Sequence, residues 1–289
     1  MIKAAGRLTF AAFALAAVSA AAATSVAVEP QSAKLPRLSG PAMRSAWLQA
    51  FQGAPMPRDA AALDQMLAGK QFSALTVRLR DVTNGDDLVL DLNWERARII
   101  DGAGFAVVYS YMYDLWRLGA ALPPAAGVDV KQTAGAMFAY GIALVMLDGP
   151  RCADPSAPSH RLDQLRSQNL DLTKFIVGQP RAARMLMGTM ALEFDQATAT
   201  LRRSDDVLCG GGLDAINAGL LANGDKPLPE QPSAPGIIGR TFAVSPSPGY
   251  QPKFVGEAMW RPKQEAVRAT LAATLTRLLT VPGDGVATR

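Results

Sequence analysis

Two apolar segments set the strongest limit on the fold of this chain. Residues 105–118 are apolar almost all round, and the stretch 134–147, inside a predicted helix over 130–148, carries no charge. A helix that is apolar on every side lies in a protein core or in a membrane. The uncharged run of about fourteen residues is shorter than the roughly 20 residues that a membrane span needs. We therefore predict two buried core helices.

The other helices are predicted from apolar residues at helical spacing and from the prolines and glycines that bound them. Four of them are expected to open at a proline: Pro41, Pro57, Pro180 and Pro262. Shorter helices are expected near three ranges: 160–168, 172–177 and 213–221. Residues 226–252 are rich in Pro, Gly and Ser and predict an irregular segment. The sequence thus predicts an all-α, irregular single-domain array of about nine or ten helices around the two buried ones.

Residues 74–92 fit two structures. Apolar residues alternate with polar ones on both sides of Asn84-Gly85, which is the pattern of a small β-hairpin. The same residues also keep helical spacing, with Thr83 followed by Asp86 as an N-terminal cap of a second helix. Because most of the chain downstream is helical, we favour two helices and keep the hairpin as the alternative.

The first 23 residues have the composition of a cleaved signal peptide. Lys3 and Arg7 precede an apolar run over 8–23 that ends in small residues. A retained membrane anchor is the alternative, since about sixteen apolar residues approach the lower limit for a span. Residues 24–39 then predict a flexible leader and 40–289 a single helical domain. The mature protein is expected to be periplasmic or secreted, without stable membrane insertion after cleavage.

The charge balance gives no sign of a nucleic-acid partner. Removing Lys3 and Arg7 lowers the formal net charge from +4 to about +2. The chain also has no run of five or more Lys and Arg residues. We expect an unknown small ligand or an envelope protein as the partner.

The two cysteines, Cys152 and Cys209, predict one disulfide in an exported chain. The bridge would close a loop of about 57 residues and stabilise the fold by about 4 kcal/mol. It would join the exit of the second core helix to the glycine-rich stretch 210–212. Two free buried thiols are the alternative.

His160 is the single histidine of the chain. Sites with two histidine ligands are therefore excluded, and any Ser-His or Cys-His nucleophile would need this residue. A zinc site formed by Cys152, His160 and Cys209 would lack a fourth ligand. We expect no metal and no cofactor, and a structural or exposed role for His160, while keeping it among the binding candidates.

Residues 105–118 also carry the main binding candidates. Aromatic residues line one side of the predicted helix, and Asp114 and Arg117 belong to a narrow polar strip. One hypothesis is an aromatic-walled pocket with a charged pair inside. The other is a core helix in which Asp114 and Arg117 satisfy each other. The candidates from this helix are the following: Tyr109, Tyr113, Asp114, Trp116 and Arg117.

Asp87, Asp91 and Glu95 lie four residues apart and would share one face of a helix, with Arg98 on the same face. Clustered carboxylates can bind Ca²⁺ or raise one another's pKa. Because Arg98 would neutralise the stripe, we predict a solvated, salt-bridged surface instead.

No sequence motif assigns a catalytic function. The chain lacks the G-x-S-x-G, H-E-x-x-H, Walker and EF-hand patterns. The preferred hypothesis is a non-enzymatic envelope protein that binds a ligand or partner or has a structural role. The alternative is an envelope hydrolase that uses two carboxyl groups at the wall of an open cleft. Its candidate acids form a pool of five: Glu95, Asp101, Asp114, Glu193 and Asp195.

Overall fold

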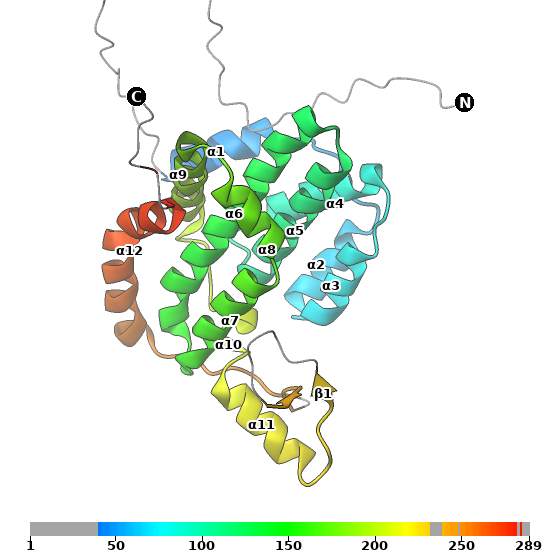
Figure 1. Ribbon diagram of the computed structural model, residues 1–289, viewed down its shortest axis with the longest axis vertical. Coiled ribbons are helices and arrows are strands. Elements are labelled where there is room, and N and C mark those ends of the chain that lie inside the picture. Colours follow the sequence, from blue (N-terminus) through cyan, green and yellow to red (C-terminus); the bar gives the residue numbers. More distant parts are fainter. Residues whose placement is uncertain (1–39, 232–238, 248, 282–283, 285–289) are drawn as a thin grey trace, which may run out of the picture. The chain divides into compact units, whose positions relative to one another are not determined.

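A computed structural model describes residues 40–231, 239–247, 249–281 and 284. The expected signal peptide (1–23) and leader (24–39) lie outside the described residues. Across the described ranges the chain forms twelve α-helices and a two-stranded sheet of four residues (Figure 1). The predicted all-α class is confirmed, with more helices than the nine or ten expected.

The core is the antiparallel pair of α5 (Phe105–Ala121) and α6 (Pro124–Asp148). A two-residue connection joins them, and the helices approach closely beside it. A Cβ atom on Gly127 would collide with the carbonyl oxygen of Gly119, so only glycine fits there. The segment Pro124–Arg151 is long and apolar enough to cross a membrane, yet 72% of its most apolar window is buried inside the fold. The helix therefore serves as a core helix here, as predicted.

The ambiguous stretch 74–92 forms two helices, α3 (Phe72–Arg80) and α4 (Gly85–Ile100). The helical alternative is therefore confirmed over the hairpin. The predicted cap is shifted by one residue, because Asn84 caps α4 and accepts a hydrogen bond of 2.8 Å from the backbone N–H of Asp87. Asn84 is thus a cap residue, and Thr83 is not. Helix α2 (Ala60–Ala68) packs beside α3.

Helix α9 (Arg181–Thr198) packs on α6, and α1 (Gly40–Ala50) packs on α9. The Trp47 and Phe194 rings are 4.6 Å apart at the contact between α1 and α9. The last helix, α12 (Glu257–Leu279), contacts both α6 and α9 (Figure 1). It begins before the predicted start, so Pro262 lies inside its second turn. The predicted start was wrong, because the helix extends one turn before the proline and forgoes one backbone hydrogen bond at Pro262, whose nitrogen carries no hydrogen.

Two shorter helices, α7 (Ser156–Ser167) and α8 (Leu170–Val177), pack against α6. The loop before them holds the 3-10 turn η1 (Gly149–Arg151). Cys152 follows this turn and is bonded to Cys209 at the end of α10 (Asp206–Cys209), with the Cα atoms 5.1 Å apart. The predicted disulfide is confirmed, and it supports residence in an oxidising compartment.

Beyond the disulfide, α11 (Leu213–Asn223) leads into the segment that was expected to be irregular. That segment holds two short strands, β1 (Glu230–Gln231) and β2 (Thr241–Phe242), in an antiparallel pair. The backbone N–H of Ala153 donates to the carbonyl oxygen of Lys253 at 3.0 Å, and that of Val255 to the carbonyl oxygen of Arg151 at 2.9 Å. These bonds hold the entry to α12 against the disulfide region.

Candidate functional site: an apolar groove between α6, α8 and α12

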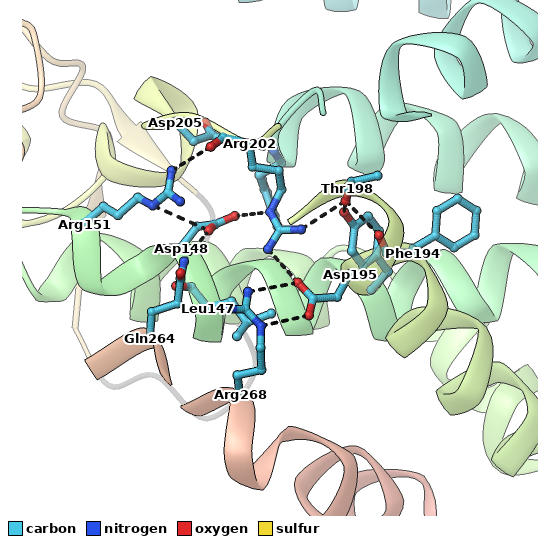
Figure 2. Close-up of polar contacts among 12 residues, drawn as sticks. Leu147, Asp148, Arg151, Phe194, Asp195, Thr198, Arg202, Asp205, Gln264 and Arg268 are labelled. Carbon is cyan, nitrogen blue, oxygen red and sulfur yellow. Dashed lines mark hydrogen bonds and ion pairs between the residues drawn. The ribbon is translucent and has the colours of Figure 1, made fainter. Parts of the chain in front are cut away.

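A buried ion-pair network fixes the position of α12 against the core. Arg202, just after α9, lies 2.8 Å from Asp148 at the end of α6 and 2.7 Å from Asp195 on α9 (Figure 2). It also donates to the hydroxyl of Thr198 at 3.0 Å. The Arg202 side chain is 1% exposed. Each charge in this network has a partner of opposite sign, as burial requires.

Helix α12 joins this network through two side chains. Gln264 donates to the carbonyl oxygen of Leu147 at 3.0 Å and to Asp148 at 3.1 Å. Arg268 reaches Asp195 at 3.3 Å (Figure 2). These contacts lie between the second turn and the middle of α12 and tie it to both α6 and α9.

A pocket of about 480 Å³ lies between the second half of α12 and helices α7 and α8, with α6 as its floor. We call it the apolar groove. Its floor and deep walls are buried side chains: Phe138, Ala139, Ile142, Ile176, Leu275 and Leu279. Its rim is formed by large apolar side chains that stay in water: Leu170, Val177 and Leu278 are 59%, 50% and 42% exposed. The volume falls within the range of about 300 to 1,000 Å³ that is typical of small-molecule sites.

The two ends of the apolar groove differ in polarity. Asp163, Arg166 and Ser167 of α7 line it beside the start of α8, where Leu170 lies. Thr173 is the one further polar residue of the lining. The opposite end is formed by Ile176, Val177 and Leu279. One end is therefore charged and the other apolar.

Arg184 of α9 binds the backbone at the apolar end of the groove. Its guanidinium donates to the carbonyl oxygen of Leu279 at 2.8 Å and to that of Val177 at 3.4 Å, and both of these residues line the apolar groove. It also donates to the carbonyl oxygen of Gln179 and pairs with Asp284. The residue is 3% exposed. One buried arginine thus joins the ends of α8 and α12.

The aromatic binding candidates of α5 lie on a different face, outside the apolar groove. The Tyr113 ring is 5.1 Å from the Arg80 guanidinium, and Lys131 is 5.2 Å from the Trp116 ring. Phe175 meets the Trp116 ring edge-on at 5.7 Å. The Tyr109 hydroxyl donates to Gln168 at 3.1 Å. These rings are half-buried and already have partners from this chain.

Asp114 and Arg117 form the ion pair that the core-helix hypothesis requires, at 2.9 Å. Arg117 also donates to the carbonyl oxygen of Val82. Burial raises the pKa of Asp114 to about 6, although the hydrogen bond and the charge of Arg117 favour its ionised form. Asp114 is buried and lines neither the apolar groove nor the smaller pocket beside Lys70.

The predicted solvated acidic face of α4 is wrong for two of its three acids, while Asp87 is exposed as predicted. Asp91 and Glu95 are both fully buried. Arg78 of α3, rather than Arg98, pairs with Asp91 at 2.7 Å, while Arg98 binds Asp64 at 2.7 Å. The face was misassigned because α3 and α5 cover it, which spacing along α4 alone does not reveal.

Glu95 is the exceptional member of this stripe. Neither of its carboxyl oxygens has a hydrogen-bond partner in the described part of the chain, and the Ser110 hydroxyl approaches it without reaching bonding geometry. Burial first, and then the charge of Asp114, raise its pKa well above the ordinary value. Burial without a hydrogen-bond partner therefore favours the protonated, neutral form of this side chain.

The other acids of the hydrolase hypothesis are dispersed. Asp101 contacts Arg44 at 3.0 Å and Arg98 at 3.3 Å, and Asp195 belongs to the Arg202 network. None of the five candidate acids lines the apolar groove. His160 is exposed on α7 and contacts Gln164 at 3.0 Å, while the two cysteines are bonded to each other. The zinc alternative thereby loses its thiolate ligands.

The smaller pocket, of about 250 Å³, offers less to a ligand. Asp205 already fills its polar wall by capping two helices: it accepts hydrogen bonds from the backbone N–H groups of Phe105 and Val207. Lys70 at its edge is paired with Asp206 at 2.5 Å.

No family model, no curated protein and no solved structure matches this chain.

Sequence analysis did not identify the apolar groove. The signal that could have been used is α8, where Leu170 and Val177 stand at the two ends of a short helix already rich in buried apolar residues. Whether an apolar residue remains exposed to solvent can be determined only from the packing of the helices around it.

Proposed function

We propose that this protein is a non-catalytic binding protein of the cell envelope, which holds the apolar part of a small molecule in the apolar groove. The observation that carries the proposal is the rim of Leu170, Val177 and Leu278, exposed around a cavity with a buried apolar floor. Apolar side chains gathered around a concave site commonly mark a binding surface.

The charge pairing of the candidate acids favours binding over hydrolysis. A hydrolase of the kind considered needs two carboxyl groups at the wall of an open cleft, roughly 5 to 10 Å apart. Asp101, Asp114 and Asp195 instead contact arginines, and Glu95 is sealed in the core. Export is supported by the composition of residues 1–23 and by the Cys152–Cys209 bridge.

Binding is tested with N-phenyl-1-naphthylamine, a neutral apolar probe whose fluorescence rises when it leaves water. The wild-type protein should give saturable binding of one probe per chain. Thr173→Trp, which places a large ring in the lining, should weaken binding at least tenfold. The matched control is Lys174→Trp on the same helix, since Lys174 does not line the apolar groove.

A second blocking variant guards against misfolding of the first. Leu278→Asp introduces a charge on the opposite wall at an exposed position, where the fold tolerates it. Both blocking variants should melt within a few degrees of the wild type. Absence of saturable binding, or equal binding by Thr173→Trp and Lys174→Trp, would overturn the proposal.

A further inference from the structure

We infer that the natural occupant of the apolar groove is a single-chain amphiphile with a zwitterionic head, one whose phosphate and ammonium groups sit close together. This inference rests on the proposed function and specifies its ligand. The placement of Asp163 and Arg166 at one end of an otherwise apolar cavity carries it.

The apolar groove has a direction. The charged lining residues all come from α7, and the lining along α8 begins at Leu170 and ends at Val177. Arg184 closes that far end by binding the backbone of Val177 and Leu279, with its own charge paired to Asp284. A ligand that is apolar throughout would leave the charged end without a partner. A ligand with one polar head and one linear tail matches both ends.

The charged end carries one charge of each sign. Asp163 and Arg166 are three positions apart on α7 and are therefore neighbours on one helix face. Across the described ranges, neither side chain takes part in an ion pair or hydrogen bond, with each other or with another residue. By contrast, Lys70 at the smaller pocket and Arg184 at the far end of the apolar groove are each paired with a carboxylate.

Both signs together select the head group. A purely anionic head would be attracted by Arg166 and repelled by Asp163. An alkylammonium head would be attracted by Asp163 and repelled by Arg166. A zwitterionic head satisfies both residues at once. Lysophosphatidylethanolamine has this chemistry, and its single acyl chain matches a cavity of about 480 Å³ within the range of small-molecule sites.

The test is displacement of N-phenyl-1-naphthylamine from the full-length mature protein by four twelve-carbon amphiphiles, each below its micelle concentration. Their heads are phosphoethanolamine, phosphate, ammonium and a neutral alcohol. The phosphoethanolamine compound should bind about two- to fivefold more tightly than each of the other three, which is the range of exposed ion pairs. This preference should shrink in high salt.

Two substitutions should change the head-group preference while leaving the apolar side chains of the groove unaltered. Asp163→Asn should improve binding of the phosphate compound, and Arg166→Gln should improve binding of the ammonium compound. Each should lower binding of the zwitterion by about two- to fivefold and leave the alcohol unchanged. Because both positions are exposed, the variants are expected to fold.

The outcomes separate this inference from the function on which it rests. If the alcohol displaces the probe as well as the zwitterion does, or if the substitutions alter all four heads equally, the head-group assignment is wrong and apolar binding stands. If no amphiphile displaces the probe and the probe itself does not bind, the proposed function is wrong as well.

Discussion

The guanidinium of Arg202 lies 2.8 Å from the carboxylate of Asp148, and the two residues are separated by 54 positions in the chain. Both are buried, and the same arginine also binds Asp195. Gln264 and Arg268 bring α12 to these same two acids. The contacts among α6, α9 and α12 therefore meet at Asp148 and Asp195, which Arg202 joins.

Replacing Arg202 should be costly for stability. Arg202→Met leaves two buried carboxylates without their main partner, and breaking a buried pair costs about 3–5 kcal/mol. Urea unfolding followed by circular dichroism measures this loss. Lys174→Met removes one side of the exposed pair with Asp171 and should change the free energy of unfolding by less than about 0.5 kcal/mol. Equal effects of the two substitutions would show that the network is not a determinant of stability.

Glu95 should make the protein less stable as the pH rises. Its pKa is raised in the folded state, so the folded chain holds a proton that the unfolded chain has released. By linkage, the free energy of unfolding then falls with rising pH from the ordinary pKa of glutamate, about 4.3 in the unfolded chain, upward to the raised folded-state value. Asp114, whose pKa is raised to about 6, adds to the slope between about 4 and 6.

Glu95→Gln should remove most of this slope, because the amide keeps the shape of the neutral acid and does not ionise. The measurement is the free energy of unfolding between pH 4 and pH 8 for both proteins. The expected result is a variant that matches the wild type at pH 4 and exceeds it at pH 8. A wild-type curve that stays level over this interval would mean that Glu95 ionises without cost.

Gly127 should not tolerate a side chain. Gly127→Ala sets a methyl group against the carbonyl oxygen of Gly119, so α5 and α6 must separate, at a cost of about 1–3 kcal/mol. Gly85→Ala is the matched control, because a Cβ there meets open space at the start of α4. In thermal denaturation, the melting temperature should fall for Gly127→Ala and stay unchanged for Gly85→Ala. Similar melting temperatures for the two variants would contradict the close approach of α5 and α6.

The disulfide should be essential to the stability of the folded protein. Cys152→Ser with Cys209→Ser removes the constraint on a loop of 57 residues and should cost about 4 kcal/mol. The same bond tests export: protein recovered from the envelope fraction should lack residues 1–23 by mass and resist a thiol-blocking reagent. Full-length protein inside the cell with two reactive thiols would contradict export.

Much of the fold could be predicted from local pattern, and the errors share one cause. The α5–α6 pair follows from apolar residues on every face, and the disulfide follows from the count of cysteines. The burial of Asp91 and Glu95 depends on Arg78 and on the cover supplied by α3 and α5. Nothing within α4 encodes that cover, so spacing along one helix predicts a face but not its neighbour.

The candidate site was less predictable for the same reason. The aromatic residues on α5 were predicted as binding candidates because aromatic side chains are common in ligand sites. Two of their rings, however, already contact cations from other helices, Arg80 and Lys131. The apolar groove is a gap among four helices, and a gap has no sequence pattern of its own.

The Cys152–Cys209 disulfide closes a covalent ring of the chain that contains α7, α8 and α9. Helix α12 comes later in the chain and is attached to this ring by noncovalent bonds at Asp195 and Arg184. Two of the four helices that line the apolar groove, α7 and α8, therefore lie inside this ring, whereas α6 and α12 lie outside it. A local opening of α12 would expose the apolar groove and leave the ring closed, so access to the groove would not require global unfolding.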